Sequence, residues 1–98
     1  MVHILLGTIS IHPEIVTMFG GQMVELFGPC IPPEIQVIKC RFGKNDHFVT
    51  YGFKVDAERV RCSVPFLTFK GWTTIELALG FNQYMYSTQI FVGKIYHS

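Results

Sequence analysis

Apolar and polar residues alternate along most of this chain with the period of two that a half-buried β-strand requires. The clearest segment is 59–64, where every second residue is apolar: Val60, Cys62 and Val64. A helix would scatter these residues around its surface. The pattern therefore predicts a strand with one face on a core and the other in water.

The same alternation predicts further strands at 9–11, 24–26, 38–42, 49–55, 73–79 and 90–92. Turn signals separate them, among them Pro13, Gly20-Gly21 and Pro65, which supply positive φ angles or a missing backbone donor. No stretch has a helical period. We therefore expect an all-β chain, an immunoglobulin-like sandwich of two antiparallel sheets with about seven strands.

Composition agrees with one packed unit. Apolar residues make up 49% of the 98 residues and charged residues 15%, which is typical of a globular chain and not of a disordered one. We expect a single domain over residues 1–98, cut from a longer multidomain protein. The apolar start, Met1 to Leu6, lacks the cationic residues and cleavage site of a signal peptide and is expected to lead into the first strand.

Charge argues against two classes of partner. The formal net charge is +1, and no run of like charge is present, so the chain offers little to a phosphate backbone. We therefore expect no nucleic-acid partner. The apolar runs are far shorter than the roughly 20 residues that cross a bilayer, so we expect no membrane insertion by this domain.

Two of the three cysteines occupy core-facing positions in predicted strands. Cys40 and Cys62 lie 22 residues apart, a placement that favours a disulfide between the two sheets. Closing such a loop contributes about 3 kcal/mol in the chain-entropy model. The alternative is two reduced core thiols. Cys30 lies outside any predicted strand, as a spare thiol or a partner for a neighbouring domain.

We find no chemistry-bearing motif. Nothing in the sequence brings Ser63, His47 and Asp46 together as a catalytic triad, so no catalytic residue and no enzyme activity are expected. The cysteines form no CxxC pair and have no histidine at zinc-finger spacing, so we expect no metal site. Gly20-Gly21 lacks the Lys-Ser/Thr of a phosphate loop, and no cofactor is expected.

The outward positions of three predicted strands are the first candidate contact surface. Aromatic, aliphatic and arginine side chains of this kind are enriched at protein interfaces. The alternative is that Trp72 and Phe91 simply cover one another or the stem of Arg41. The candidate residues are Val37, Arg41, Trp72, Glu76 and Phe91, with Lys39, Thr74 and Gln89 beside them.

A second candidate surface is the predicted hairpin tip at residues 81–86. Its aromatic residues Tyr84 and Tyr86 resemble those of immunoglobulin-type binding loops, and we expect them to form an interaction loop. The alternative is that Phe81 and Met85 fold back and close the end of the sandwich.

Short motifs in a fixed order carry a family resemblance. Residues 18–30 place Gly20-Gly21 before a strand that ends at Gly28-Pro29-Cys30, and Cys40-Arg41-Phe42-Gly43 and Cys62-Ser63-Val64-Pro65 follow. This order resembles the IPT/TIG domains, which are immunoglobulin-like modules. It is most similar to the extracellular IPT-like domain of the mesh, mucin-4 and sushi-domain-containing-protein-2 group.

The resemblance implies a module in the extracellular part of a single-pass cell-surface protein of the adhesion or epithelial-junction type. Its partners would be other protein domains, in cis or in trans. Neither Asn45 nor Asn82 has a Ser or Thr two residues on, so no N-glycosylation acceptor is present. Two alternatives stay open: an intracellular TIG domain of a transcription factor, and an accessory carbohydrate-binding domain in which Trp72, Tyr84 and Tyr86 stack on sugars.

Overall fold

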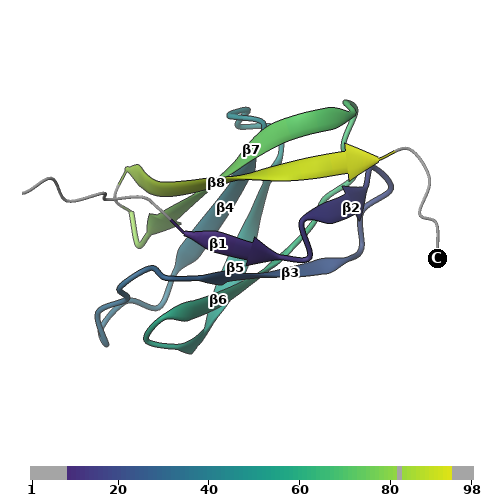
Figure 1. The fold of residues 1–98 in the computed structure, drawn as a ribbon. Helices are drawn as coiled ribbons and strands as arrows, with labels where there is room; N and C mark the ends of the chain where they lie inside the picture. Colours follow the sequence, from purple (N-terminus) through teal and green to yellow (C-terminus); the bar gives the residue numbers. More distant parts are fainter. Residues whose placement is uncertain (1–8, 82, 94–98) are drawn as a thin grey trace, which may run out of the picture.

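The computed structural model describes residues 9–81 and 83–93, and that part of the chain contains eight β-strands and no helix (Figure 1). The segment from Met1 to Leu6, which is expected to run into the first strand, lies outside the described residues. The strands are β1 (Ser10–His12), β2 (Ile15–Thr17), β3 (Met23–Phe27), β4 (Ile38–Phe42), β5 (Val49–Asp56), β6 (Arg59–Ser63), β7 (Gly71–Leu79) and β8 (Tyr84–Gly93). The predicted all-β class is confirmed.

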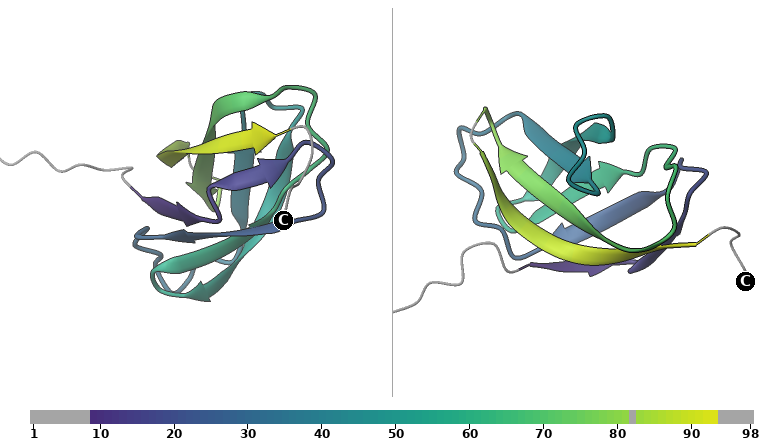
Figure 2. Two further views of the ribbon diagram at one scale, coloured as in Figure 1. Left: turned by 45° about the vertical axis from the view of Figure 1, so that its right-hand side comes forward. Right: turned by 90° about the horizontal axis from the view of Figure 1, so that it is seen from above.

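The strands form two facing layers that share one strand (Figures 1 and 2). Neighbours follow the order β1-β3-β6-β5-β4-β7-β8-β2, and each pair is antiparallel except β2 with β8. We call the layers the β3–β6 sheet, which includes β1, and the β4–β7–β8 sheet, which includes β2. The first half of β5 pairs with β4 and its second half with β6. The architecture fits the expected immunoglobulin-like sandwich.

The structure has one strand more than the alternation predicts, because the chain near the N-terminus divides at Pro13. β1 pairs with β3, whereas β2 lies beside β8 in the other sheet. The His12–Pro13 peptide between them is cis. Proline has no N–H to donate to a ladder, so the pairing of β1 ends there. The sequence pattern identified only the first of these two strands.

β8 is also much longer than the predicted segment 90–92. It spans Tyr84–Gly93 and pairs with β7 as far as Ala78 opposite Tyr84. The placement of Tyr84 and Tyr86 in a loop is therefore wrong, since both lie in a strand. Aromatic and β-branched residues fit a pleated sheet well, and the long β7 offers partners for them.

The core lies between the sheets, where the predicted inward residues meet. Leu26, Phe42, Val60, Leu77 and Ile90 are all fully buried. β5 is the exception, because its apolar side chains face outward; Tyr51 is 69% exposed and Phe53 53% exposed. The inward position between them is Gly52.

A disulfide joins the two layers through the core. Cys40 on β4 and Cys62 on β6 form the predicted bridge, with Cα atoms 6.3 Å apart, and both residues are fully buried. The bridge is confirmed and the alternative of two reduced thiols is excluded. Cys30 is free and exposed, and its backbone N–H donates a 3.2 Å hydrogen bond to the hydroxyl oxygen of Tyr86.

Gly52 stands where β5 passes from one sheet to the other, directly beside the disulfide. A methyl group at this position would lie 2.8 Å from the carbonyl oxygen of Arg61 and 3.0 Å from the sulfur of Cys40. Neither atom belongs to a flexible side-chain end. The close approach of β4, β5 and β6 at the bridge therefore requires a residue without a side chain.

Gly52→Ala is expected to lower the free energy of unfolding by about 1–3 kcal/mol, the usual cost of forcing an extra methyl into a packed core. Urea unfolding followed by Trp72 fluorescence measures it. Lys54→Ala on the same strand is the control and should change stability by less than about 0.5 kcal/mol. An unchanged or higher stability of Gly52→Ala would show that the crossing has room for a side chain.

Candidate interaction face

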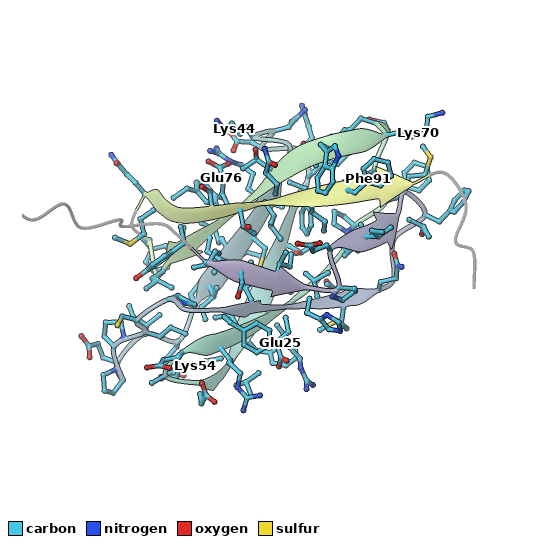
Figure 3. The ribbon with its side chains drawn as sticks, viewed as in Figure 1. Glu25, Lys44, Lys54, Lys70, Glu76 and Phe91 are labelled. Atoms are coloured by element: carbon cyan, nitrogen blue, oxygen red, sulfur yellow. A yellow bond between two sulfur atoms is a disulfide. The ribbon has the colours of Figure 1, made fainter. Side chains whose placement is uncertain are left out.

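The register of β4, β7 and β8 brings four of the five predicted face residues to the outer side of their sheet. Arg41 pairs with Glu76 across β4 and β7, and Trp72 pairs with Phe91 across β7 and β8. Thr74 and Gln89, also expected there, form the pair next to Trp72 and Phe91. Figure 3 shows Glu76 and Phe91 on the same side of the molecule, opposite Glu25. We call this side the outer face.

Val37 is separated from the rest of the predicted set. It precedes β4, and its carbonyl oxygen accepts a 2.6 Å hydrogen bond from the N–H of Gly80. Gly80 follows the end of β7, whereas Trp72 stands at its beginning. Val37 and Trp72 therefore lie at opposite ends of the sheet and cannot contribute to one small contact patch.

An apolar row crosses three strands at one end of the outer face. The rings of Trp72 and Phe91 meet edge to face with centroids 5.3 Å apart, and Ile15 on β2 lies beside Phe91. Trp72 is 62% exposed and Ile15 59% exposed, so the mutual packing of the two rings leaves much of the row in contact with solvent. We call Ile15, Phe91 and Trp72 the Trp72 row.

Ile15 is the residue that sequence reasoning missed. The β-branched run Ile15-Val16-Thr17 just after Pro13 was a usable strand signal. The N–H of Phe91 donates a 2.8 Å hydrogen bond to the carbonyl oxygen of Glu14, which ties β2 to β8.

A hollow of about 480 Å³ lies next to the Trp72 row at the edge of the sheet. It is lined by Pro13, Ile15, Thr17 and Gln22.

A charged cluster occupies the middle of the outer face. The guanidinium of Arg41 donates to Glu76 at 2.9 Å and to Asp46 at 3.0 Å, and it stacks over the ring of Tyr84 with 4.0 Å from its carbon to the ring centroid. The bond to Glu76, followed by the bond to Asp46, raises the pKa of Arg41 above its ordinary value. Arg41 is thus a fixed cation whose charge is already matched.

An irregular register sends the two predicted loop tyrosines to opposite faces. Leu77 pairs with Tyr86 and the next residue, Ala78, pairs with Tyr84, so two β7 neighbours face residues that are two apart on β8. Tyr84 joins the outer face under Arg41, and burial raises the pKa of its hydroxyl, an effect that Arg41 partly opposes. Tyr86 packs against the core.

Arg41→Met should lower the free energy of unfolding by about 2 kcal/mol, because it leaves the partly buried Glu76 unpaired and removes the stacking on Tyr84. Arg61→Met on the opposite face is the matched control. Arg61 is half exposed and holds Glu25 at 3.3 Å, so its loss should cost less than about 0.5 kcal/mol. Equal urea midpoints for the two variants would show that the contacts of Arg41 with Glu76 and Tyr84 stabilise the fold no more than an exposed ion pair does.

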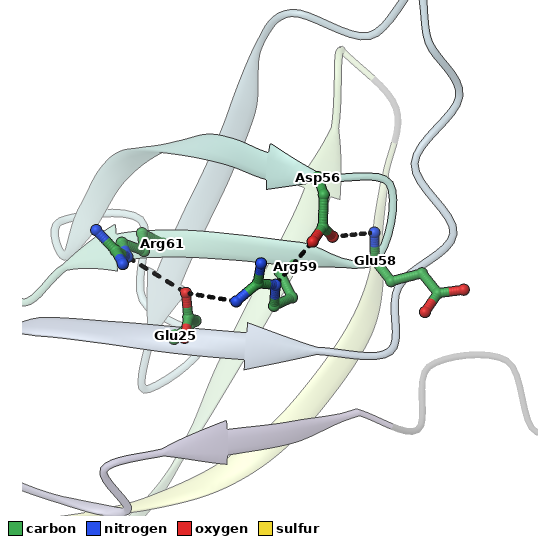
Figure 4. A network of polar contacts seen from close by, with 5 residues as sticks. All are labelled: Glu25, Asp56, Glu58, Arg59 and Arg61. Atoms are coloured by element: carbon green, nitrogen blue, oxygen red, sulfur yellow. Dashed lines mark hydrogen bonds and ion pairs between the residues drawn. The ribbon is translucent and has the colours of Figure 1, made fainter.

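The opposite face, formed by β3, β5 and β6, carries a different network (Figure 4). Glu25 lies 3.3 Å from Arg61 and 3.9 Å from Arg59, and Arg59 also donates to Asp56 at 2.8 Å. The backbone N–H of Glu58 donates to Asp56 at 2.8 Å. This bond first, and Arg59 second, lower the pKa of the Asp56 carboxyl below its usual value.

The lowered pKa of Asp56 fixes the sign of a pH effect. The carboxylate stabilises the β5–β6 turn above the ordinary pKa of aspartate, and this contribution is lost as the pH falls through the lower folded-state pKa. An NMR titration of the carboxyl carbons should place Asp56 below the ordinary value. Arg59→Gln should raise that midpoint part of the way, and Arg61→Gln, which does not contact Asp56, should leave it unchanged. An unperturbed midpoint in the parent chain would contradict the network.

Two kinds of feature are absent from the part of the chain that the structure describes. Within residues 9–81 and 83–93, no helix is long and apolar enough to cross a membrane. In the same ranges, no group of three or more His, Cys, Asp or Glu residues could hold a metal ion.

The comparisons with known proteins give one informative relative. No protein-family model matches the chain. Over 80 residues the chain is 34% identical to Protein mesh of Bombyx mori, and the aligned stretch covers 82% of this chain but only 5% of that protein. The chain is thus similar to one small part of a much longer protein, in the group that its motifs resemble.

Proposed function

We propose that this chain is a non-catalytic IPT/TIG-like module in the extracellular part of a single-pass cell-surface protein of the adhesion or epithelial-junction type. It spaces neighbouring domains and contacts other protein domains, in cis or in trans, through the outer face. The single observation that carries the contact role is the Trp72 row, an ordered apolar surface left open to solvent. It acts without nucleic acid and without inserting into a membrane.

Three further observations support this proposal. The buried Cys40–Cys62 bridge suits an oxidising compartment. The similarity to part of Protein mesh agrees with a small module of a long protein. The body is 41 Å long, and β8 ends at one end of it while β1 begins toward the other (Figure 1), a geometry suited to a spacer.

The polar groups of the two faces also fit a structural module better than an enzyme. The carboxylates of Glu25, Asp46, Asp56 and Glu76 each contact an arginine. Groups matched in this way stabilise the sheets and hold their charge fixed, whereas catalysis needs a group free to transfer a proton or attack a substrate. We therefore assign the chain no catalytic residue.

The aromatic residues do not favour a sugar-binding role. Tyr86 packs against the core, Arg41 covers the ring of Tyr84, and Trp72 stands at the start of β7. Stacking on a sugar ring needs an open aromatic face, and these three side chains share no such platform.

Trp72→Ser should reduce aggregation of suspended cells that display the intact protein. Removing a central interface tryptophan costs about 2 kcal/mol, or roughly 30-fold in partner affinity. Phe81→Ser is the matched control, because Phe81 is 90% exposed but lies beyond the far end of β7. Unchanged aggregation by Trp72→Ser at equal surface expression would refute the outer face as the contact surface.

A further inference from the structure

The charges of the outer face are unevenly matched. Two carboxylates of this face, Asp46 and Glu76, bind the single guanidinium of Arg41. Lys39 lies over the ring of Tyr84, with 5.5 Å from its nitrogen to the ring centroid. Among the described residues, 9–81 and 83–93, no carboxylate lies within ion-pair distance of Lys44 or Lys70. The face therefore carries a positive charge that its own residues do not neutralise.

The two unmatched lysines flank the Trp72 row. Lys70 is two residues before Trp72 and directly precedes the start of β7 at Gly71. Lys44 follows Gly43, whose N–H donates a 2.7 Å bond to the carbonyl oxygen of Thr74. Figure 3 shows Lys44 and Lys70 on the same side as Glu76 and Phe91.

The opposite face provides an internal comparison. Its two arginines, Arg59 and Arg61, share Glu25, and Arg59 also binds Asp56 (Figure 4). Lys54 on β5 lies far from Lys44 and Lys70 (Figure 3), and it too has no carboxylate within ion-pair distance among the described residues. Both faces expose apolar side chains, but the arginines of the opposite face are held by carboxylates, whereas Lys44 and Lys70 beside the Trp72 row are not.

We infer that the outer face binds an acidic protein segment: an apolar side chain of the partner covers the Trp72 row, and carboxylates on either side of it meet Lys44 and Lys70. The inference rests on the proposed function and names the chemistry of the partner. An apolar anchor supplies most of the affinity of such an interface, whereas charges at its rim set the association rate and the choice of partner. A basic partner is repelled by the same lysines.

Three synthetic peptides test this chemistry. They share a central Trp-Phe-Leu and carry four flanking residues that are all Glu, all Gln or all Lys. Each is titrated into the isotope-labelled 98-residue chain at low salt, and amide shifts are followed by NMR. We expect shifts at residues 15, 72 and 91, with the Glu peptide bound about tenfold more tightly than the Gln peptide and the Lys peptide weakest, since each exposed ion pair contributes a few-fold. Added salt should bring the Glu peptide toward the Gln peptide.

Charge reversal provides the decisive control. The double variant Lys44→Glu/Lys70→Glu should prefer the Lys peptide, whereas Lys54→Glu, on the opposite face, should keep the order of the parent chain. Trp72→Ser should weaken all three peptides, and Phe53→Ser, which removes an exposed ring of the other face, should weaken none.

The outcomes separate the two proposals. Equal binding of the Glu and Gln peptides at the Trp72 row, or an unchanged order in the double lysine variant, would overturn the acidic partner while leaving the contact surface in place. Absence of shifts at residues 15, 72 and 91 with every peptide would overturn both the acidic partner and the outer face.

Discussion

The Cys40–Cys62 bridge is the constraint on which the rest of the structure depends. It fixes β4 of one sheet to β6 of the other at the place where β5 crosses between them, and the crossing is possible because Gly52 brings no side chain against the sulfur of Cys40. A small domain has little core with which to offset its chain entropy, so a covalent link of this kind contributes a large share of its stability. It also determines which side of β4 faces out.

That orientation has a direct effect on the surface. With Cys40 inward, Arg41 is outward, where the β4–β7 register gives it Glu76 as partner. The register of β7 with β8 then places Trp72 beside Phe91, and β2 adds Ile15. The outer face is therefore a consequence of the same pairing that builds the core. The arginines of the opposite face are instead paired with Glu25 and Asp56, which stabilises the strands that carry them.

Much of the fold and part of the outer face could be predicted from the sequence. The features that could not be predicted depend on pairing between strands. Strict alternation sufficed for the class, for most strands and for the inward pair Cys40 and Cys62. Alternation counts residues within one strand, so it misses an irregular pairing; the shift between Leu77 and Ala78 is what divides Tyr84 from Tyr86. The partnership of Arg41 with Glu76 depends on register between distant segments, and Val37 was misplaced because its pairing with Gly80 lies beyond the strand end.

The measurement that tests the account most directly is a map of thiol reactivity in the native, non-reduced protein. Alkylation followed by digestion and mass spectrometry should modify Cys30 alone and should recover a peptide in which Cys40 is linked to Cys62. Alkylation of Cys40 or Cys62 in the native protein, or a linkage of either one to Cys30, would contradict the bridge and with it the orientation of the outer face.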